Sequence, residues 1–314
     1  MKLESEKNCR AASEAIFGSS ARGDADKLSD RDILIVDENI ALLRIRAAVL
    51  KADGWSVASY TFKKLEALAA RGALFVQHLK LESRILVDRS NRLASVLSAY
   101  QPKTCYAVEL DANSRLAGLL SIVGEGSLSE MWAADVLYVT VRNYGVLKLA
   151  GEGIHVYSFD GILAGLVDSD LISKTSAKHL RQLRFMKCLY RSGETALPGK
   201  VLNSVQLALS GLPVGHFPRK ILQVSSTKVL LSMPPKRCDA AYLILRDLEK
   251  RLIAAQFLNC GPVSESELHD LQRWVADPRI YANLSASLAP ALRKQLRRYS
   301  NRNDDLAQRL VNLA

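Results

Sequence analysis

The sequence predicts an α+β fold in which a small sheet-containing domain precedes a mainly α-helical domain. Strand and helix patterns alternate as far as about residue 100, and from Thr104 onward one helical pattern follows another. A chain of 314 residues is long for one domain, so two are expected. We predict a first domain at residues 1–100 and an α-helical domain at 101–314, and a split of the latter into two helical subdomains near 195–235 stays open.

The first domain shows short apolar runs separated by amphipathic stretches. The clearest helix is expected at 40–52, where apolar residues recur at helical spacing after Asp37-Glu38-Asn39 and Asp53-Gly54 ends the pattern. The expected elements are a helix at 3–14, a strand ending at Phe17, strands at 30–36, 55–60 and 84–87, and one or two helices within 62–81.

The remainder of the chain is predicted as a succession of helices with glycine and proline at the joints. The expected helices cover residues 104–123, 128–150, 157–169, 173–192, 198–210, 236–258, 264–275 and 283–312. Residues 221–231 are the exception, because their pattern fits a short hairpin or a helix–loop–helix.

The stretch Phe17–Val36 carries the strongest chemical signal in the chain. A Gly18-Ser19 turn follows a strand, and Asp30 and Asp32 stand at the head of the next predicted strand. Side chains two apart on a strand point to the same face, so the two carboxylates can share one Mg²⁺ or Mn²⁺ ion. A glycine-containing turn lets backbone N–H groups approach a phosphate closely. Together these features predict a site for a metal–nucleoside triphosphate.

A hydrophobic–Gly–Ser motif followed after ten residues by Asp-x-Asp resembles the signature of the DNA polymerase β-like nucleotidyltransferases, in particular their minimal type. The resemblance covers roughly the first 90–100 residues and implies a small mixed sheet. It implies that Asp30 and Asp32 are catalytic and hold the metal, and that Gly18, Ser19, Ser20 and Arg22 bind the nucleotide. A hydroxyl of an acceptor would then attack the α-phosphate of the nucleoside triphosphate, for example ATP, and release pyrophosphate.

One position departs from the family pattern. The resemblance implies a third carboxylate on the strand at 55–60, but this stretch offers Ser56 or Ser59 instead. Asp88, at the end of the last predicted strand, is the nearest substitute. Loss of the third acid would weaken catalysis without abolishing nucleotide binding.

Composition limits the cellular setting and the partners. The five cysteines are scattered and odd in number, which favours free thiols in the cytoplasm. The apolar runs are too short for a membrane span, and the charged start, MKLESEKNCR, does not fit a secretion signal. A net charge of +11 favours anionic partners, namely a nucleotide, a nucleic acid or an acidic protein.

Two basic helical stretches stand out, at 174–187 and at 293–302. In the first, Lys174, Lys178, Arg181 and nearly Arg184 recur at three- and four-residue spacing and form a stripe. Such a stripe could grip a triphosphate tail or an RNA backbone, and a solvated helix face explains it equally well. A protein partner for the helical domain stays open.

Three classes of function follow from these observations. The first is a metal-dependent nucleotidyltransferase acting on a protein, an RNA or a small molecule, of the kind often found in defence or toxin–antitoxin systems. The second is an aminoglycoside-type small-molecule transferase, which the basic charge disfavours. The third is a nucleotide-binding regulatory protein with weakened catalysis, which the missing third acid favours.

Overall fold

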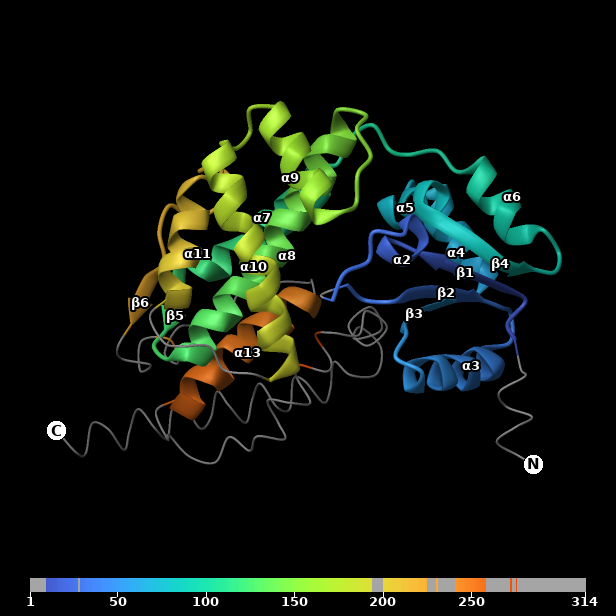
Figure 1. Cartoon of the computed structure of the whole chain (residues 1–314), viewed down its shortest axis with the longest axis horizontal. Coiled ribbons are helices and arrows are strands. Elements are labelled where there is room, and N and C mark those ends of the chain that lie inside the picture. The colour runs from blue at the N-terminus through green and yellow to red at the C-terminus, as the bar shows by residue number, and fades with distance from the viewer. Residues whose placement is uncertain are drawn as a thin grey trace. The chain divides into compact units, whose positions relative to one another are not determined.

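The computed structural model of the chain describes residues 10–27, 29–193, 200–224, 230, 241–257, 272 and 275. Two compact units can be distinguished, one formed by Met1–Ala107 with Gly145–Leu166 and the other by Val108–Tyr144 with Val167–Ala314. The first unit holds a four-stranded sheet and the second is mainly helical (Figure 1). The α+β class is therefore confirmed, and the domain ranges 1–100 and 101–314 stay a prediction.

The first unit is built on a mixed sheet with the strand order β3-β2-β1-β4. Its strands are β1 (Ser13–Phe17), β2 (Asp32–Val36), β3 (Ser56–Tyr60) and β4 (Ser83–Asp88). β1 runs antiparallel to β2 and to β4, whereas β2 and β3 run parallel. Gly18 and Ser19 therefore follow β1 and Asp32 begins β2, and these two strands are neighbours in the middle of the sheet.

Helices cover both faces of this sheet (Figure 1). They are α2 (Ser19–Arg22), α3 (Ile40–Ala52), α4 (Phe62–Ala70), α5 (Leu74–Glu82) and α6 (Arg92–Ala99). Ile33 and Ile35 of β2 pack on the side of α3, while Leu34 and Val36 pack on the side of α4, α5 and α6. This alternation is the period of two expected for a strand buried on both faces.

The structure corrects several predicted elements of the first unit. The described part of the predicted helix at 3–14 is not helical, because residues 10–12 precede a strand that begins at Ser13. β2 begins at Asp32, two residues later than predicted, and the short α2 and the helix α6 were not predicted. The helix at 40–52 is confirmed, with Asn39 as its cap accepting hydrogen bonds from the amides of Ala41 and Leu42.

The second unit contains most of the remaining helices. The elements after residue 106 are α7 (Ala107–Ala117), a 3-10 turn (Gly118–Ser121), β5 (Ile122–Gly124), α8 (Ser127–Gly151), α9 (Phe159–Asp168), α10 (Lys174–Ser192), α11 (Lys200–Ser210), β6 (Leu222–Val224) and α13 (Ala241–Phe257). Among these, α8 and α9 include residues of both units. None of the helices that the structure describes combines the length and apolar character needed to cross a membrane.

One prediction for this part of the chain is wrong. The helix expected at 104–123 ends at Ala117, and Ile122–Gly124 instead forms β5, which pairs in parallel with β6. The hairpin or helix–loop–helix predicted at 221–231 lies partly outside the described residues, and Leu222–Val224 within it is a strand whose partner is about a hundred residues away in sequence. The helices expected at 264–275 and 283–312 lie outside the described residues, apart from 272 and 275.

A buried network of charges links three helices of the second unit. Asp135 of α8 lies 2.7 Å from the guanidinium of Arg246 in α13 and 2.9 Å from that of Arg191 in α10. Glu249, one turn along α13 from Arg246, accepts hydrogen bonds from Trp132 Nε1 at 3.1 Å and from the Tyr190 hydroxyl at 2.6 Å. Each carboxylate is thus compensated, as burial of charge requires.

Candidate functional site

The Gly18-Ser19 turn connects the end of β1 to the four-residue helix α2. Gly18 has φ 66° and ψ −146°, a conformation that only glycine adopts without strain. Its amide donates to the carbonyl oxygen of Glu82 at 3.2 Å, which anchors the turn to the start of β4. The amides of Ser19 and Ser20 open the first turn of α2, where a helix supplies no internal acceptor.

Asp32 lies against this turn. In the β1–β2 ladder Asp32 is the partner of Phe17, so the carboxylate and the turn share one end of the sheet. A β-carbon placed on Gly18 would lie 3.3 Å from Asp32 Oδ2 and 3.9 Å from Nε2 of His78. The absence of a side chain at Gly18 therefore leaves room beside the carboxylate, as the sequence motif predicts.

Asp30 lies outside the ladder. It is exposed and precedes the first residue of β2 by two positions, whereas Asp32 is half-buried. The prediction that one regular strand holds both carboxylates is therefore wrong for Asp30, since strand geometry does not fix its direction. Its role beside Asp32 stays a prediction.

The third carboxylate is absent from β3, as expected from its sequence. The parallel register places Ser56 opposite Asp32 and Ser59 opposite Ile35, so Ser56 is the β3 residue nearest the site. Asp88 does not replace the missing acid, because it is paired with Ser13 at the opposite end of β1. Its carboxylate accepts hydrogen bonds from the Ser13 hydroxyl at 2.8 Å and from the Ala94 amide at 2.9 Å. Asp88 therefore anchors the start of α6.

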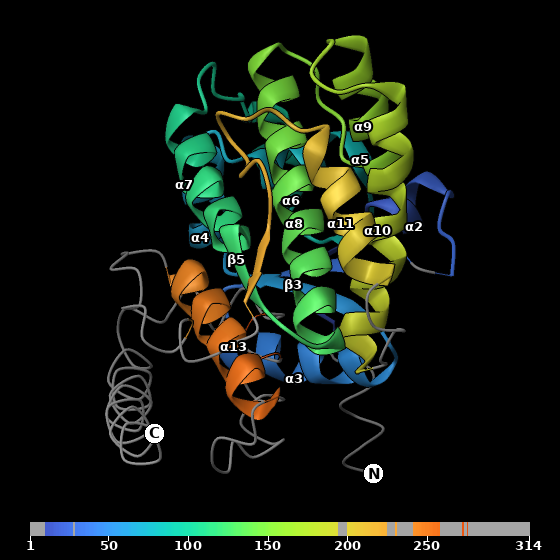
Figure 2. The same ribbon diagram turned by 90° about the vertical axis from the view of Figure 1, so that its left-hand side faces the viewer.

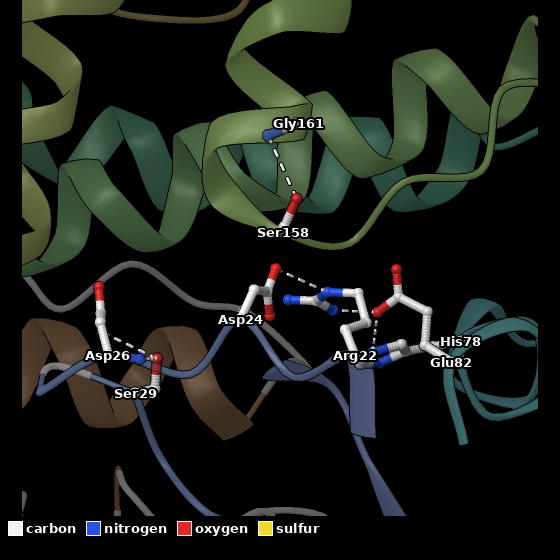
Figure 3. Close-up of polar contacts among 8 residues, drawn as sticks. All are labelled: Arg22, Asp24, Asp26, Ser29, His78, Glu82, Ser158 and Gly161. Carbon is white, nitrogen blue, oxygen red and sulfur yellow. Dashed lines mark hydrogen bonds and ion pairs between the residues drawn. The ribbon is translucent and has the colours of Figure 1, made fainter. Parts of the chain in front are cut away.

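Another acid, which the sequence motif does not indicate, lies closer to the turn. Glu82, the last residue of α5, contacts the guanidinium of Arg22 and lies 3.0 Å from Nε2 of His78 through its Oε2 atom (Figure 3). Arg22 also contacts Asp24 at 3.1 Å. The signal available in the sequence was the i,i+4 spacing of His78 and Glu82 at the end of a helix, which is too common to select them.

Charge and burial act against each other in this network. Burial disfavours the charge on Arg22, but hydrogen bonds and charge interactions with Asp24 and Glu82 outweigh it and raise the pKa of Arg22. Burial likewise favours the neutral form of Glu82, but His78 and Arg22 outweigh it and lower the pKa of Glu82. The ion pair of Arg22 and Glu82 is therefore the stable form near neutral pH.

Aromatic packing fixes the His78 ring. Tyr157 stacks on it with ring centroids 4.3 Å apart and an interplanar angle of 20°, and Phe17 meets it edge-on at 5.5 Å. The Tyr157 hydroxyl donates to the carbonyl oxygen of Leu74 at 3.2 Å, which ties residue 157 to the start of α5. These contacts hold His78 and its partner Glu82 in place beside the turn.

The donor set around the turn suits a hard divalent cation. The described residues contain no group of three or more His, Cys, Asp or Glu side chains arranged to hold a metal ion. Asp32 nevertheless offers carboxylate oxygen beside a glycine whose missing β-carbon leaves space, and Asp30 offers a second carboxylate on the adjoining segment. Carboxylate and phosphate oxygens are the ligands that Mg²⁺ prefers, so these residues fit a metal held jointly by the protein and a nucleotide.

Comparison with known proteins identifies one family over the first quarter of the chain. A family model described as a nucleotidyltransferase domain matches residues 4–86. This segment contains the Gly-Ser turn, Asp30, Asp32, His78 and Glu82, and the resemblance to the polymerase β-like nucleotidyltransferases is thereby confirmed. No curated protein and no solved structure matches the chain.

Proposed function

We propose that this protein is a metal-dependent nucleotidyltransferase that transfers a nucleoside monophosphate from a nucleoside triphosphate to a hydroxyl of an acceptor. The observation that carries the proposal is the proximity of Gly18 to Asp32: a β-carbon added to Gly18 would lie 3.3 Å from the Asp32 carboxylate. The match of residues 4–86 to a nucleotidyltransferase domain supports the same reaction class. The acceptor is a protein, an RNA or a small molecule, and a role in defence or in a toxin–antitoxin pair fits this chemistry.

Each part of the site has a role in this proposal. The Gly18 turn with the amides and hydroxyls of Ser19 and Ser20 binds the β- and γ-phosphates. Asp30 and Asp32 hold Mg²⁺ or Mn²⁺, which, when bound, neutralises phosphate charge and orients the reacting groups. The guanidinium of Arg22 is paired with Glu82 and Asp24. Arg22 would therefore have to share its hydrogen-bond donors between these carboxylates and a bound phosphate.

A second candidate is a nucleotide-binding regulatory protein with weakened catalysis. Two observations favour it, namely the serine at the β3 position opposite Asp32 and the engagement of Arg22 by two carboxylates. An aminoglycoside-type activity has less support, because a cationic acceptor is disfavoured by a net charge of +11.

Transfer of label from an α-labelled nucleoside triphosphate distinguishes the nucleotidyltransferase from the regulatory protein. Purified protein is incubated with Mg²⁺ and each α-labelled nucleoside triphosphate, alone and with cell lysate, beside an Asp30→Asn/Asp32→Asn variant. A matched control is Asp168→Asn/Asp170→Asn, which alters an exposed Asp-x-Asp pair far from the turn in sequence. We expect label transfer by the wild type and the control, and a loss of at least about 100-fold in the Asp30/Asp32 variant.

Other outcomes have clear meanings. Nucleotide binding that needs both aspartates without label transfer would support the regulatory protein. Transfer that persists in the Asp30/Asp32 variant would contradict the assigned site, and neither binding nor transfer would contradict both candidates.

A further inference from the structure

The positive charge of the chain is concentrated in one segment. Residues 171–238 contain twelve lysines and arginines and a single acidic residue, Glu194. Their net charge of +11 equals that of the whole chain, so the remaining residues are balanced. Such segregation points to one anion-binding region, whereas a merely soluble protein intersperses both signs.

The structure places the described part of this segment in the second unit, mostly on α10 and α11. α10 and α11 pack together (Figure 2). Ser176 of α10 leaves no room for a side chain on Gly211, just beyond α11. Ala177, Leu180 and Leu183 bury one face of α10. Lys174, Lys178 and Arg181 are exposed and therefore lie away from this apolar face. Toward the end of α10, by contrast, Arg191 pairs with Asp135 of α8 and Lys187 lies 5.2 Å from the centroid of the Tyr138 ring.

One stripe of α10 combines charge with an exposed aromatic ring. Lys174, Lys178, Arg181 and Phe185 follow one another at spacings of four, three and four residues, and all four are exposed. The Phe185 side chain is among the exposed large hydrophobic groups, with 54% of the residue surface accessible. Spacings of this kind align side chains along one face of a helix, over about 16 Å for eleven residues.

We propose that this α10 stripe, Lys174, Lys178, Arg181 and Phe185, binds single-stranded RNA as the acceptor of the transfer reaction. Lysine and arginine contact phosphates, and an exposed aromatic ring can stack on an unpaired base. An acidic protein would use the charges without needing Phe185, so the ring favours a nucleic acid. The acceptor role rests on the proposed nucleotidyltransferase function, whereas RNA binding by the stripe stands independently of it.

Binding is measured on the full-length protein with a fluorescent 20-nucleotide single-stranded RNA at several KCl concentrations. Three phosphate contacts predict a slope of about −2 for log K against log salt, and about 15-fold weaker binding at 200 mM than at 50 mM. We expect Lys174→Gln/Lys178→Gln/Arg181→Gln to remove most of this slope. Phe185→Ala should weaken binding roughly 5- to 100-fold with the slope unchanged.

The matched control is Lys51→Gln/Lys63→Gln/Lys64→Gln, which removes three exposed positive charges from the first unit. This variant should keep the affinity and the salt slope of the wild type, because it changes net charge equally without touching α10. Circular dichroism checks that each variant is folded.

Three results would overturn the proposal. They are no RNA binding by the wild type at 50 mM salt, equal losses in the stripe and control variants, and binding of poly-glutamate or of double-stranded DNA as tight as that of the RNA. Asp30→Asn/Asp32→Asn should still bind RNA, so failure of the transfer function is distinguishable from failure of the stripe. If transfer occurs, the stripe variant should lose labelling of RNA while retaining Mg²⁺-dependent nucleotide binding.

Discussion

Gly18 is the residue on which the geometry of the site depends most. Its backbone occupies a region closed to other residues, and the space beside it is bounded by Asp32 Oδ2 and the His78 ring. The sequence motif predicted the turn and Asp32 because both are local patterns. It did not predict Glu82, which reaches the turn only because β4 pairs with β1.

Gly18→Ala should therefore impair both stability and nucleotide binding. The strained backbone costs about 1–3 kcal/mol of unfolding free energy, and the new methyl group crowds the carboxylate. The control is Gly23→Ala, at φ +81° with no neighbouring atom within 4 Å of the added carbon, which should cost about 1–2 kcal/mol and spare binding. Urea denaturation and titration with Mg²⁺–nucleotide measure the two effects, and equal binding by both variants would contradict the role of Gly18.

At the scale of elements, the sequence predicted those helices and strands whose ends are set by residues adjacent in sequence. The helix at 40–52 was predicted with correct ends because a capping residue, Asn39, and a terminating glycine, Gly54, lie beside it in sequence. β5 was taken for the end of a helix because its three residues pair with β6, far along the chain. Asp88 was named as the nearest substitute for the missing acid, and the structure shows that its carboxylate instead binds the Ser13 hydroxyl on the neighbouring strand and the amide of Ala94.

Asp88 illustrates the difference between an anchor and a site residue. Asp88→Ala removes hydrogen bonds to the amides of Leu93 and Ala94 and to the Ser13 hydroxyl, so it should lower the unfolding free energy by about 1–2 kcal/mol. Nucleotide binding should stay within twofold of wild type in thermal-shift titrations. A selective loss of binding without loss of stability would show that Asp88 belongs to the site after all.

At the scale of the molecule, charged residues of the second unit occur both as buried ion pairs and as exposed side chains. The second unit buries Asp135 with Arg246, and Asp135 also pairs with the exposed Arg191. Lys174 and Lys178 of α10 are exposed. Composition showed that the chain is basic, but it could not show which charges are buried and paired. Which charges are buried is decided by the packing of α8, α10 and α13, which brings Asp135, Arg191 and Arg246 together.

The buried network predicts a specific dependence of stability on pH. Burial favours protonated Asp135, but the charges of Arg246 and Arg191 outweigh it and lower its pKa. Because the folded pKa lies below the unfolded value of about 3.9, the stabilisation is complete above that pH and is lost as the pH falls through the folded pKa. Asp135→Asn should therefore cost about 3–5 kcal/mol at pH 7, since it removes the carboxylate that pairs with Arg191 and with the buried Arg246.

The deficit of Asp135→Asn should shrink as the pH falls below about 4, because Asp135 then binds a proton in the unfolded chain while the folded wild type still holds it charged, which lowers the stability of the wild type. Urea denaturation followed by tryptophan fluorescence reports this, since Trp132 donates to Glu249 within the network. Asp111→Asn is the control, because Asp111 pairs with Arg115 at 3.2 Å on the surface and should cost less than about 1 kcal/mol. A deficit that is the same at pH 7 and pH 3.5 would mean that packing, and not the charge of Asp135, holds the three helices together.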